Sequence, residues 1–334
     1  MVELSWQRTR RYLDSLKGAA IAVVGDVMLD RYYWGSVHRV SPEAPVPVVD
    51  VEHETAHLGG AANVAMNLAG LGVRPLLVGV IGHDSAGETV QALCRETGLS
   101  SSCLAVSAER PTTTKTRIIG NNQQIARIDH EVRNYIDERV RDQVMHTLAE
   151  CDDLRGIVLE DYDKGLLSPL LITDVISMAR QRQIPVFVDP KRRQFFNYEH
   201  CTVFKPNRKE VSDALGVPVR TMEDVEHVGR ALLDRLQCQS VLITLGAEGM
   251  MLIERDAAPR TVPTRARKVA DVSGAGDTTI ATLAAMVCAG ASIPEAAALA
   301  NVAAGHVVAE PGIVAITSDQ LVADVAGLAE GSAS

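Results

Sequence analysis

Short apolar runs alternate with longer helical patterns along most of the chain. The runs are rich in Val, Ile and Leu, which predicts buried strands at 21–24, 76–81, 156–159, 185–188 and 240–244. Segments of helical length lie between or after them, at 61–71, 86–97, 139–150, 169–181, 225–236, 294–308 and 318–328. This alternation predicts a three-layer α/β/α fold, in which helices cover both faces of a mostly parallel sheet.

Two β-rich segments, 32–57 and 112–129, interrupt the alternation and carry Pro or Asn at their turns. They predict a small separate sheet, which is either a lid that excludes water from the ligand crevice or a surface meander. The exposed aromatic residues Tyr32, Tyr33 and Trp34 and the unpaired strand edges favour a homodimer in which two lids pack together. We expect one domain over 1–334, with a flexible tail at 329–334.

Composition narrows the class of protein. The 334 residues are 22% charged and 46% hydrophobic, which is typical of a globular protein. A formal net charge of -9 argues against nucleic acid as a partner, because nucleic-acid binding needs basic surface. The six cysteines are far apart and form no metal-binding pattern, and the early apolar run at 19–25 is too short for a signal peptide or a membrane span. We therefore expect a cytoplasmic protein with reduced thiols and no membrane partner.

Polar residues follow several predicted strands at their carboxyl ends. They are Asp26 after the first strand, Asp161, the run 189–191 and the run 244–246. Ligands bind beyond the carboxyl ends of the strands in sheets of this kind. These residues therefore outline one crevice.

The run 271–279 reads Asp-Val-Ser-Gly-Ala-Gly-Asp-Thr-Thr and precedes an apolar helical segment at 280–289. Gly274, Ala275 and Gly276 have little or no side chain, so backbone N–H groups can converge on an anion at the start of the helix. Asp277 lies in the first turn, where a carboxylate can take the proton of an attacking hydroxyl. This pattern predicts phosphoryl transfer, and an ordinary Gly-rich helix start is the alternative.

Other nucleotide and metal motifs are missing or out of context. The run 53–57 matches the zinc pattern H-E-x-x-H, which requires a helix, but 46–51 alternates like a strand and Gly59 and Gly60 follow. We therefore expect no zinc. The chain has neither a G-x-x-x-x-G-K-[ST] run nor a protein-kinase signature, so any ATP binds through another fold.

Two further helix starts carry polar residues suited to ligands. Asn63 follows Gly59 and Gly60, and its amide can bond to a polyol. Asn207 and Glu210 follow a strand end, and an amide with a carboxylate at this spacing can hold metal-bound water near phosphates. Helix capping is the alternative at both places.

Taken together, these motifs resemble the ribokinase-like family of carbohydrate kinases over about 17–328. The resemblance is carried by Gly59-Gly60-x-x-Asn63 followed by Gly72 and Gly82, by Asn207-x-x-Glu210, and by Asp271-x-x-Gly274-Ala275-Gly276-Asp277. It implies a ribokinase-like core with a small β-sheet lid, and transfer of a phosphoryl group from ATP to a sugar.

The resemblance also implies roles for single residues. Asp277 would be the catalytic base, residues 274–277 the anion hole, and Asn207 and Glu210 the holders of Mg²⁺ through water. ATP would contact Asn207, Thr244, Gly246, Gly249, Gly274, Gly276 and Asn301. The sugar would contact Asp26, Asp30, Gly59, Gly60, Asn63, Arg127, Asp161, Lys164 and Lys191.

Two positions depart from the family pattern. Val272 stands where the family usually has Thr, which argues against the monovalent-cation (K⁺) site that the resemblance implies at Asp271. The Lys that some pentose kinases carry after their Gly-Gly pair is missing, which disfavours ribose as the substrate.

Within the family, the runs 24–32, 41–48, 59–67 and 161–165 are similar to those of the branch that acts on a phosphorylated heptose. This implies phosphorylation at C1 of D-glycero-β-D-manno-heptose 7-phosphate, on the way to ADP-heptose for lipopolysaccharide, by a stand-alone kinase without the fused adenylyltransferase of many bacteria. Another phosphosugar, such as fructose 1-phosphate, is the alternative substrate. A sugar-binding regulator without catalysis would lack the base, which Asp277 supplies.

A phosphorylated acceptor needs cations inside an otherwise acidic protein. Six basic residues in the predicted lid or at strand ends are candidates, and a solvated surface charge is the alternative for each. They are Lys115, Arg117, Arg127, Lys164, Lys191 and Arg192.

Overall fold

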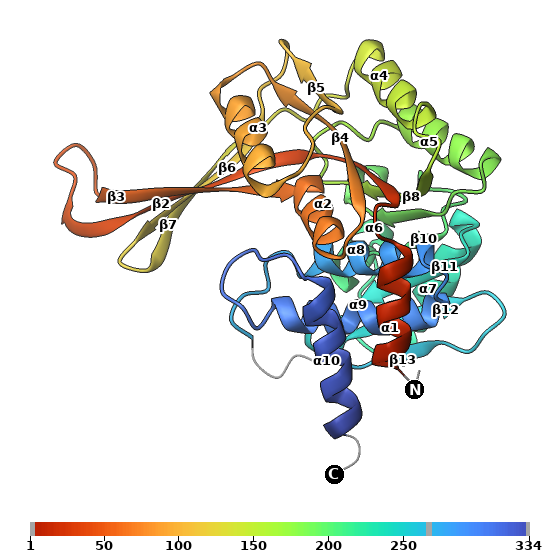
Figure 1. The fold of residues 1–334 in the computed structure, drawn as a ribbon. Helices are drawn as coiled ribbons and strands as arrows, with labels where there is room; N and C mark the ends of the chain where they lie inside the picture. The colour runs from red at the N-terminus through yellow and green to blue at the C-terminus, as the bar shows by residue number, and fades with distance from the viewer. Residues whose placement is uncertain (1–3, 265–268, 332–334) are drawn as a thin grey trace.

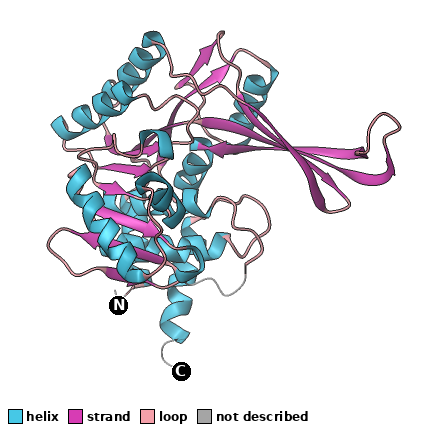
Figure 2. Cartoon of the chain, turned by 180° about the vertical axis from the view of Figure 1, so that it is seen from behind, coloured by secondary structure: helices cyan, strands magenta, loops and turns pink. Residues whose placement is uncertain are grey.

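The computed structural model describes residues 4–264 and 269–331. Its centre is a nine-stranded sheet with helices on both faces (Figures 1 and 2), as the alternation predicts. The strand order is β13-β12-β11-β10-β9-β8-β1-β4-β5. The bounds are β1 Ala20–Gly25, β4 Arg74–Gly82, β5 Leu104–Ser107, β8 Leu154–Glu160, β9 Val186–Asp189, β10 Val203–Phe204, β11 Ser240–Thr244, β12 Met250–Glu254 and β13 Arg260–Val262.

Strands β1, β4, β5, β8, β9, β10 and β11 run parallel, whereas β12 and β13 add an antiparallel edge. The five strands predicted from apolar runs are all present, at β1, β4, β8, β9 and β11. Their carboxyl ends therefore share one edge of the sheet, which is where the predicted polar residues lie.

Alternate side chains of each strand feed two separate hydrophobic cores. On β1, Ile21 and Val23 point to one core and Ala22 and Val24 to the other. The first core packs against α1 Trp6–Ser15, α2 Ala61–Gly70, α3 Ser85–Thr97, α8 Ala275–Cys288, α9 Ile293–Val307 and α10 Ser318–Gly331. The second packs against α4 Glu138–Ala149, α5 Pro169–Gln181, α6 Arg208–Leu215 and α7 Met222–Leu236.

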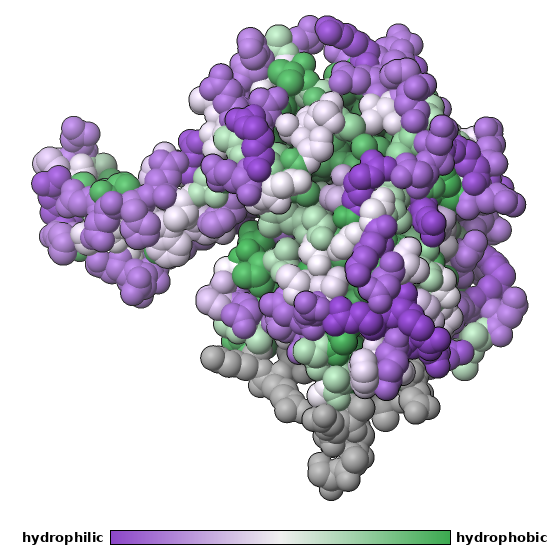
Figure 3. Space-filling model, viewed as in Figure 1, coloured by the Kyte–Doolittle hydropathy of each residue, from purple (hydrophilic) through white to green (hydrophobic). Residues whose placement is uncertain are grey.

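The two β-rich segments form a second sheet, called the small sheet below. Its strand order is β3-β2-β6-β7, with β2 at Val27–Val40, β3 at Pro47–Gly60, β6 at Thr113–Gly120 and β7 at Gln123–His130. Figure 1 shows that these strands project away from the body of the molecule. The surface of this projection is mostly hydrophilic, and some apolar atoms show near its far end (Figure 3).

The C-terminal helix α10 extends to Gly331 and so includes 329–331 of the predicted tail, whose flexibility stays a prediction. The remainder of that predicted tail, 332–334, lies outside the described residues. Among the helices that the structure describes, none combines the length and apolar character needed to cross a membrane.

Candidate active site

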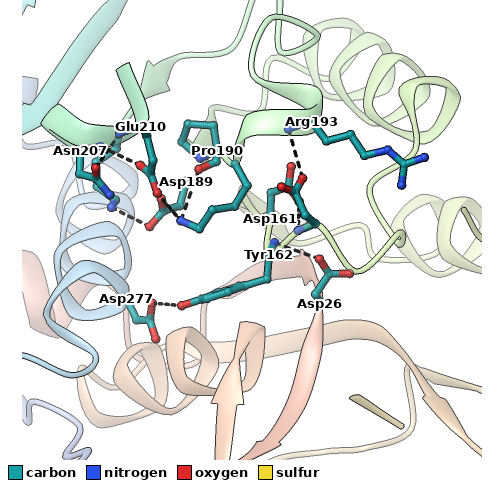
Figure 4. Close-up of polar contacts among 12 residues, drawn as sticks. Asp26, Asp161, Tyr162, Asp189, Pro190, Arg193, Asn207, Glu210 and Asp277 are labelled. Carbon is teal, nitrogen blue, oxygen red and sulfur yellow. Dashed lines mark hydrogen bonds and ion pairs between the residues drawn. The ribbon is translucent and has the colours of Figure 1, made fainter. Parts of the chain in front are cut away.

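The predicted base, Asp277, is buried in the first turn of α8. Its two carboxylate oxygens both accept hydrogen bonds: Oδ2 from Asn63 Nδ2 at 2.6 Å and Oδ1 from Tyr162 Oη at 3.0 Å. Figure 4 shows the Tyr162 ring pointing toward Asp277 from the loop after β8. The helix begins at Gly274, whose φ of 78° is left-handed and whose place beside the Asn63 amide leaves no room for a Cβ atom.

Burial raises the pKa of Asp277 to about 6. The hydrogen bond from Asn63 opposes this shift, and the negative charge of Asp189 adds to it. Such a carboxylate is mostly ionised at neutral pH and is still a stronger base than an exposed aspartate. This is the protonation behaviour that a general base requires.

Three buried carboxylates meet at this point. Glu160 at the end of β8, Asp189 at the end of β9, and Asp277 each have an oxygen within 4.8 Å of the other two. Neither oxygen of Glu160 has a hydrogen-bond partner among the described residues. Burial, together with the charges of Asp189 and Asp277, raises the pKa of Glu160 well above its ordinary value.

Lys205, which follows β10, supplies the positive charge closest to this cluster. Its Nζ lies 2.6 Å from Asp189 Oδ2, and it is buried. Burial acts to lower the pKa of Lys205, but Asp189 and Glu160 outweigh it and raise the pKa, so the ammonium stays charged. Lys191 Nζ lies farther away, 3.8 Å from Asp189 Oδ1, and two ammonium groups do not balance three carboxylates. The unpartnered Glu160 oxygens fit a hard divalent cation such as Mg²⁺.

Asn207 and Glu210, the predicted holders of Mg²⁺ through water, form a capping box at the start of α6. Asn207 Oδ1 accepts from the Glu210 backbone N–H, and Glu210 Oε2 accepts from the Asn207 backbone N–H, both at 2.8 Å. Glu210 Oε1 also bonds to Lys191 Nζ at 2.5 Å. The capping alternative is therefore present, and a contact with metal-bound water stays a prediction.

A cavity of about 550 Å³ opens beside the start of α8. Six of the seven residues predicted to contact ATP line it: Asn207, Thr244, Gly246, Gly249, Gly276 and Asn301. Gly274 does not line it and instead forms the N-cap of α8. Apolar side chains such as Val269, Val272 and Val308 complete the wall, which suits a flat aromatic base.

Asp271, the predicted K⁺ ligand, is not part of this wall. Its Oδ1 accepts the Ser273 backbone N–H at 2.8 Å, in the turn before α8. This bond gives the carboxylate a structural role in the turn. The cation site at Asp271 stays a prediction that the neighbouring Val272 disfavours.

Asp26 and Asp161, both predicted to bind sugar, hold the loop after β8. The Asp26 carboxylate accepts backbone N–H groups of Tyr162, Lys164 and Leu166 at 2.9 to 3.2 Å. Asp161 accepts from the Asp163 backbone at 2.8 Å and from the Tyr198 hydroxyl at 2.7 Å. Burial, and next the charge of Asp26, raises the pKa of Asp161 to about 7. These bonds fix the loop that carries Tyr162.

Gly59 and Gly60 end β3 beside two of the predicted sugar ligands. A Cβ on Gly59 would lie 2.1 Å from Asp30 Oδ2, and a Cβ on Gly60 would lie 2.3 Å from the Asp26 carbonyl oxygen. The φ of Gly60 is 60°, which also favours glycine. Asp30 itself is buried and forms an ion pair with Arg117 at 2.6 Å.

The three cations predicted to bind the sugar all have acidic partners. Arg127 is exposed on β7 and binds Asp129 at 2.9 Å, and Lys164 pairs with Glu131 at 2.6 Å. Lys191 pairs with Glu210 and also lies 3.8 Å from Asp189 Oδ1. Burial acts to lower the pKa of Lys191, but these two carboxylates outweigh it and raise the pKa.

The H-E-x-x-H pattern at 53–57 lies on strand β3, where its two imidazoles do not share a helical face. His53 stacks on Trp34 and His57 contacts Tyr32 edge to face. Both histidines are therefore part of the small sheet's aromatic packing.

Sequence reasoning missed Tyr162, Glu160 and Lys205. Tyr162 stood in the recognised run 161–165, and Lys205 directly precedes the Pro206-Asn207 pair. Glu160 gave no signal of its own, because a single acidic residue at a strand end is common. Only the fold brings it beside Asp189 and Asp277.

Comparison with known proteins agrees with this geometry. The family model for pfkB family carbohydrate kinases matches residues 19–320. The bifunctional protein HldE of Paramagnetospirillum magneticum is 43% identical over 96% of this chain and 66% of its own length, and that of Caulobacter vibrioides is 44% identical over 92% and 63%. The chain thus spans just under two thirds of the length of these relatives.

Solved structures share the fold. Arabidopsis thaliana ribokinase complexed with ribose and ATP has a TM-score of 0.75 at 20% identity, covering 92% of this chain and 99% of that one. Escherichia coli phosphofructokinase-2 in complex with potassium has a TM-score of 0.77 at 18% identity, covering 93% and 99%. The ribokinase-like fold expected from the sequence is therefore confirmed, and the chain is a sugar kinase that belongs to the pfkB family of carbohydrate kinases.

Proposed function

We propose that this chain transfers the γ-phosphoryl group of ATP to the C1 hydroxyl of D-glycero-β-D-manno-heptose 7-phosphate. The observation that carries the proposal is the position of Asp277. This buried base follows Ala275 and Gly276, which line a cavity of nucleotide size, and it accepts a hydrogen bond from Tyr162. The ammonium groups of Lys115 and Lys191 lie 5.0 and 5.2 Å from the centroid of the Tyr162 ring. The HldE relatives and the runs similar to heptose kinases support the choice of sugar.

In this proposal the adenine ring of ATP lies in the cavity, and its phosphates point toward the start of α8. Backbone N–H groups of 274–277 and the positive end of the α8 dipole would stabilise charge on the transferred phosphoryl group. Lys205, whose ammonium lies close to Gly276, would add a full positive charge there. Mg²⁺ would neutralise phosphate charge, with Glu160 and Asp189 as the residues suited to hold it.

The chemical step forms one bond and breaks another. The C1 oxygen of the sugar attacks the γ-phosphorus, the bond to the β,γ-bridging oxygen breaks, and ADP leaves. Asp277 accepts the proton of the C1 hydroxyl. Asn63 donates to Asp277 Oδ2 and Tyr162 donates to Asp277 Oδ1. These two hydrogen bonds would keep the carboxylate oriented toward the sugar hydroxyl.

The relatives' name gives them two functions, and the proposal concerns only the sugar kinase. A place on the route to ADP-heptose for lipopolysaccharide, and action as a stand-alone kinase, remain predictions. The test is a coupled ADP-release assay with heptose 7-phosphate, unphosphorylated heptose, fructose 1-phosphate and ribose. Heptose 7-phosphate should give the highest kcat/KM, and faster turnover of any other sugar would contradict the proposal.

We also propose that the small sheet is a lid and that two lids pack together in a homodimer. One face of the sheet has a shallow apolar hollow of about 550 Å³. The residues lining it are Tyr33, Val46, Pro47, Val49, Val51, Ile118, Ile125 and Ala126. An exposed apolar face on projecting strands is expected to be covered by a partner. Light scattering at micromolar concentration tests this, since a monomeric mass would contradict it.

A further inference from the structure

Several of the candidate cations lie on the small sheet or in the loops after β8 and β9, and four of them are neutralised within the protein. Each of four has its own carboxylate at 2.5 to 2.9 Å. The pairs are Arg117 with Asp30, Arg127 with Asp129, Lys164 with Glu131, and Lys191 with Glu210. Each of these four cations is therefore already neutralised before a ligand binds.

Of the six candidate cations, Lys115 and the exposed Arg192 have no such carboxylate among the described residues. Lys115 lies on β6, close to its start. It is half-buried, and within the described part of the chain no carboxylate lies at ion-pair distance from its Nζ. In the small sheet it is in register with Asp30 on one side and Asp129 on the other. Both of these carboxylates are already held by arginines, so neither is available to neutralise Lys115.

An unpaired ammonium in this position is costly in the free enzyme. Burial lowers the pKa of Lys115; the charge of Asp30 opposes this, and the charges of Lys164 and Arg117 add to it. A neutral side chain at this position, or a carboxylate beside it, would avoid this cost. An anion arriving from solution would supply the missing partner and would gain a charge-assisted hydrogen bond.

Tyr162 connects this ammonium with the reaction centre. Lys115 Nζ lies 5.0 Å from the centroid of the Tyr162 ring, and the hydroxyl at the other end of the same side chain donates to Asp277. Lys191 Nζ lies 5.2 Å from the same ring, but Glu210 neutralises it. A sugar lying along Tyr162 can therefore have one end at the base and its other end at Lys115.

We propose that Lys115 binds the phosphate that the acceptor sugar already carries and so determines the preference for phosphorylated over unphosphorylated sugar. The inference rests on the proposed function, because it requires an acceptor with an anionic group remote from the reacting hydroxyl. The dianion would replace the Tyr162 ring face as the partner of the ammonium. Binding energy at this remote end would orient the reacting hydroxyl toward Asp277.

The experiment compares Lys115→Met and Lys115→Arg with the wild type on heptose 7-phosphate and on unphosphorylated heptose. Lys115→Met should lower kcat/KM for the phosphorylated sugar about 10- to 100-fold, as expected for one charged contact. The values for the unphosphorylated sugar and the KM for ATP should stay within about twofold of wild type, which is the usual scatter of an uninvolved position. Lys115→Arg should recover most of the loss because it keeps the charge.

Arg31→Met is the matched control. Arg31 lies on the neighbouring strand β2 and has its own partner, Glu54, at 2.9 Å. Its removal should leave the ratio between the two sugars unchanged. Thermal unfolding gives a second readout: without sugar, Lys115→Met should be at least as stable as wild type, since it removes an unpaired charge. Heptose 7-phosphate should stabilise it less than it stabilises wild type.

Three results would overturn the inference: no effect of Lys115→Met, an equal loss on both sugars, or a loss specific to the phosphorylated sugar in Arg127→Met alone. Failure of the proposed function looks different. If wild type prefers another phosphosugar to the heptose, the heptose assignment fails, and the same ratio on that sugar and its unphosphorylated form decides the role of Lys115. If wild type accepts only unphosphorylated sugars, or none of those offered, both proposals fail.

Discussion

The two sides of Asp277 are built in different ways. On the nucleotide side, glycines and helix starts, including Gly246, Gly249 and Gly276, line the cavity together with polar side chains such as Asn207 and Asn301. On the proposed acceptor side, long charged side chains from segments far apart in the chain form ion pairs, as in the Lys164–Glu131 and Arg117–Asp30 pairs.

This difference decides how each side can recognise a ligand. Backbone N–H groups at helix starts suit any phosphate chain, so the nucleotide side can stay constant while substrates differ. Ion pairs among side chains can be rearranged by single substitutions, and in the proposal above Lys115 then selects the acceptor. The proposal therefore assigns specificity to the acceptor side.

Asp277 belongs to both sides, and its removal should have the largest effect. Asp277→Asn keeps the shape of the side chain but cannot accept the proton of the sugar hydroxyl, so kcat should fall about 10²- to 10⁴-fold. ATP should still bind with nearly wild-type affinity, which isothermal titration calorimetry measures. Near-normal turnover would exclude Asp277 as the base, and loss of ATP binding would mean that the two sides are not separable here.

A pair of glycine variants tests whether the nucleotide side depends on its backbone. Gly249 has a φ of 92°, and an added Cβ would lie 2.1 Å from the Val262 carbonyl oxygen. Gly246 also has a positive φ, 62°, but an added Cβ there would meet no atom within 4 Å. Gly249→Ala should cost about 3 kcal/mol of unfolding free energy, and Gly246→Ala about 1 kcal/mol.

The kinetics of the same pair sharpen the comparison. Gly249→Ala should raise the KM for ATP more than the KM for the sugar, because the strain falls on the wall of the cavity. Gly246→Ala is the matched control, because it also places a side chain on left-handed backbone but causes no steric clash. Urea unfolding and steady-state kinetics measure both effects, and an equal rise of the two KM values in Gly249→Ala would contradict the separation of the two sides.

The same contrast explains what the sequence could predict. Residues 274–277 were singled out because the need for small residues at a tight helix start is local, whereas Gly246 and Gly249 came from the family resemblance. That these residues contact ATP stays a prediction. The parallel sheet was found because strands buried on both faces have continuous apolar runs. The strands β5, β10, β12 and β13 were missed, although the predicted strands β9 and β11 are as short as β5 and β12.

The acceptor side was predicted less well for a physical reason. Lys115, Arg117, Arg127, Lys164 and Lys191 were all candidates, but a sequence does not show which carboxylate will neutralise which cation. Glu131 neutralises Lys164 and Glu210 neutralises Lys191, and the two members of each pair lie far apart in the sequence. Only the folded structure shows that, among the described residues, Lys115 is half-buried and has no carboxylate at ion-pair distance.

The raised pKa of Asp277 predicts how the rate depends on pH. The base must be ionised to accept a proton, so kcat/KM should fall as the pH drops through about 6, roughly tenfold per pH unit below it. An exposed aspartate would keep the rate high down to about pH 4. A profile of kcat/KM between pH 5 and 8 measures this fall in rate. The ionisation of the sugar phosphate is determined separately by titrating the free substrate and is then subtracted. A rate that stays flat down to pH 5 would contradict a buried base.

Tyr162→Phe should give the smallest change, and one that appears mainly in the pH profile. The hydroxyl hydrogen bond at 3.0 Å lowers the pKa of Asp277 against the effect of burial, so its loss should move the acidic limb to higher pH. The shift should be at most about one pH unit, as expected for one hydrogen bond of about 1 kcal/mol. The variant should therefore lose more activity at pH 6 than at pH 8. Tyr12→Phe, which removes a 3.0 Å bond to Glu295, should leave the limb unchanged. A loss that is large and equal at every pH would instead make the Tyr162 hydroxyl part of the proton transfer.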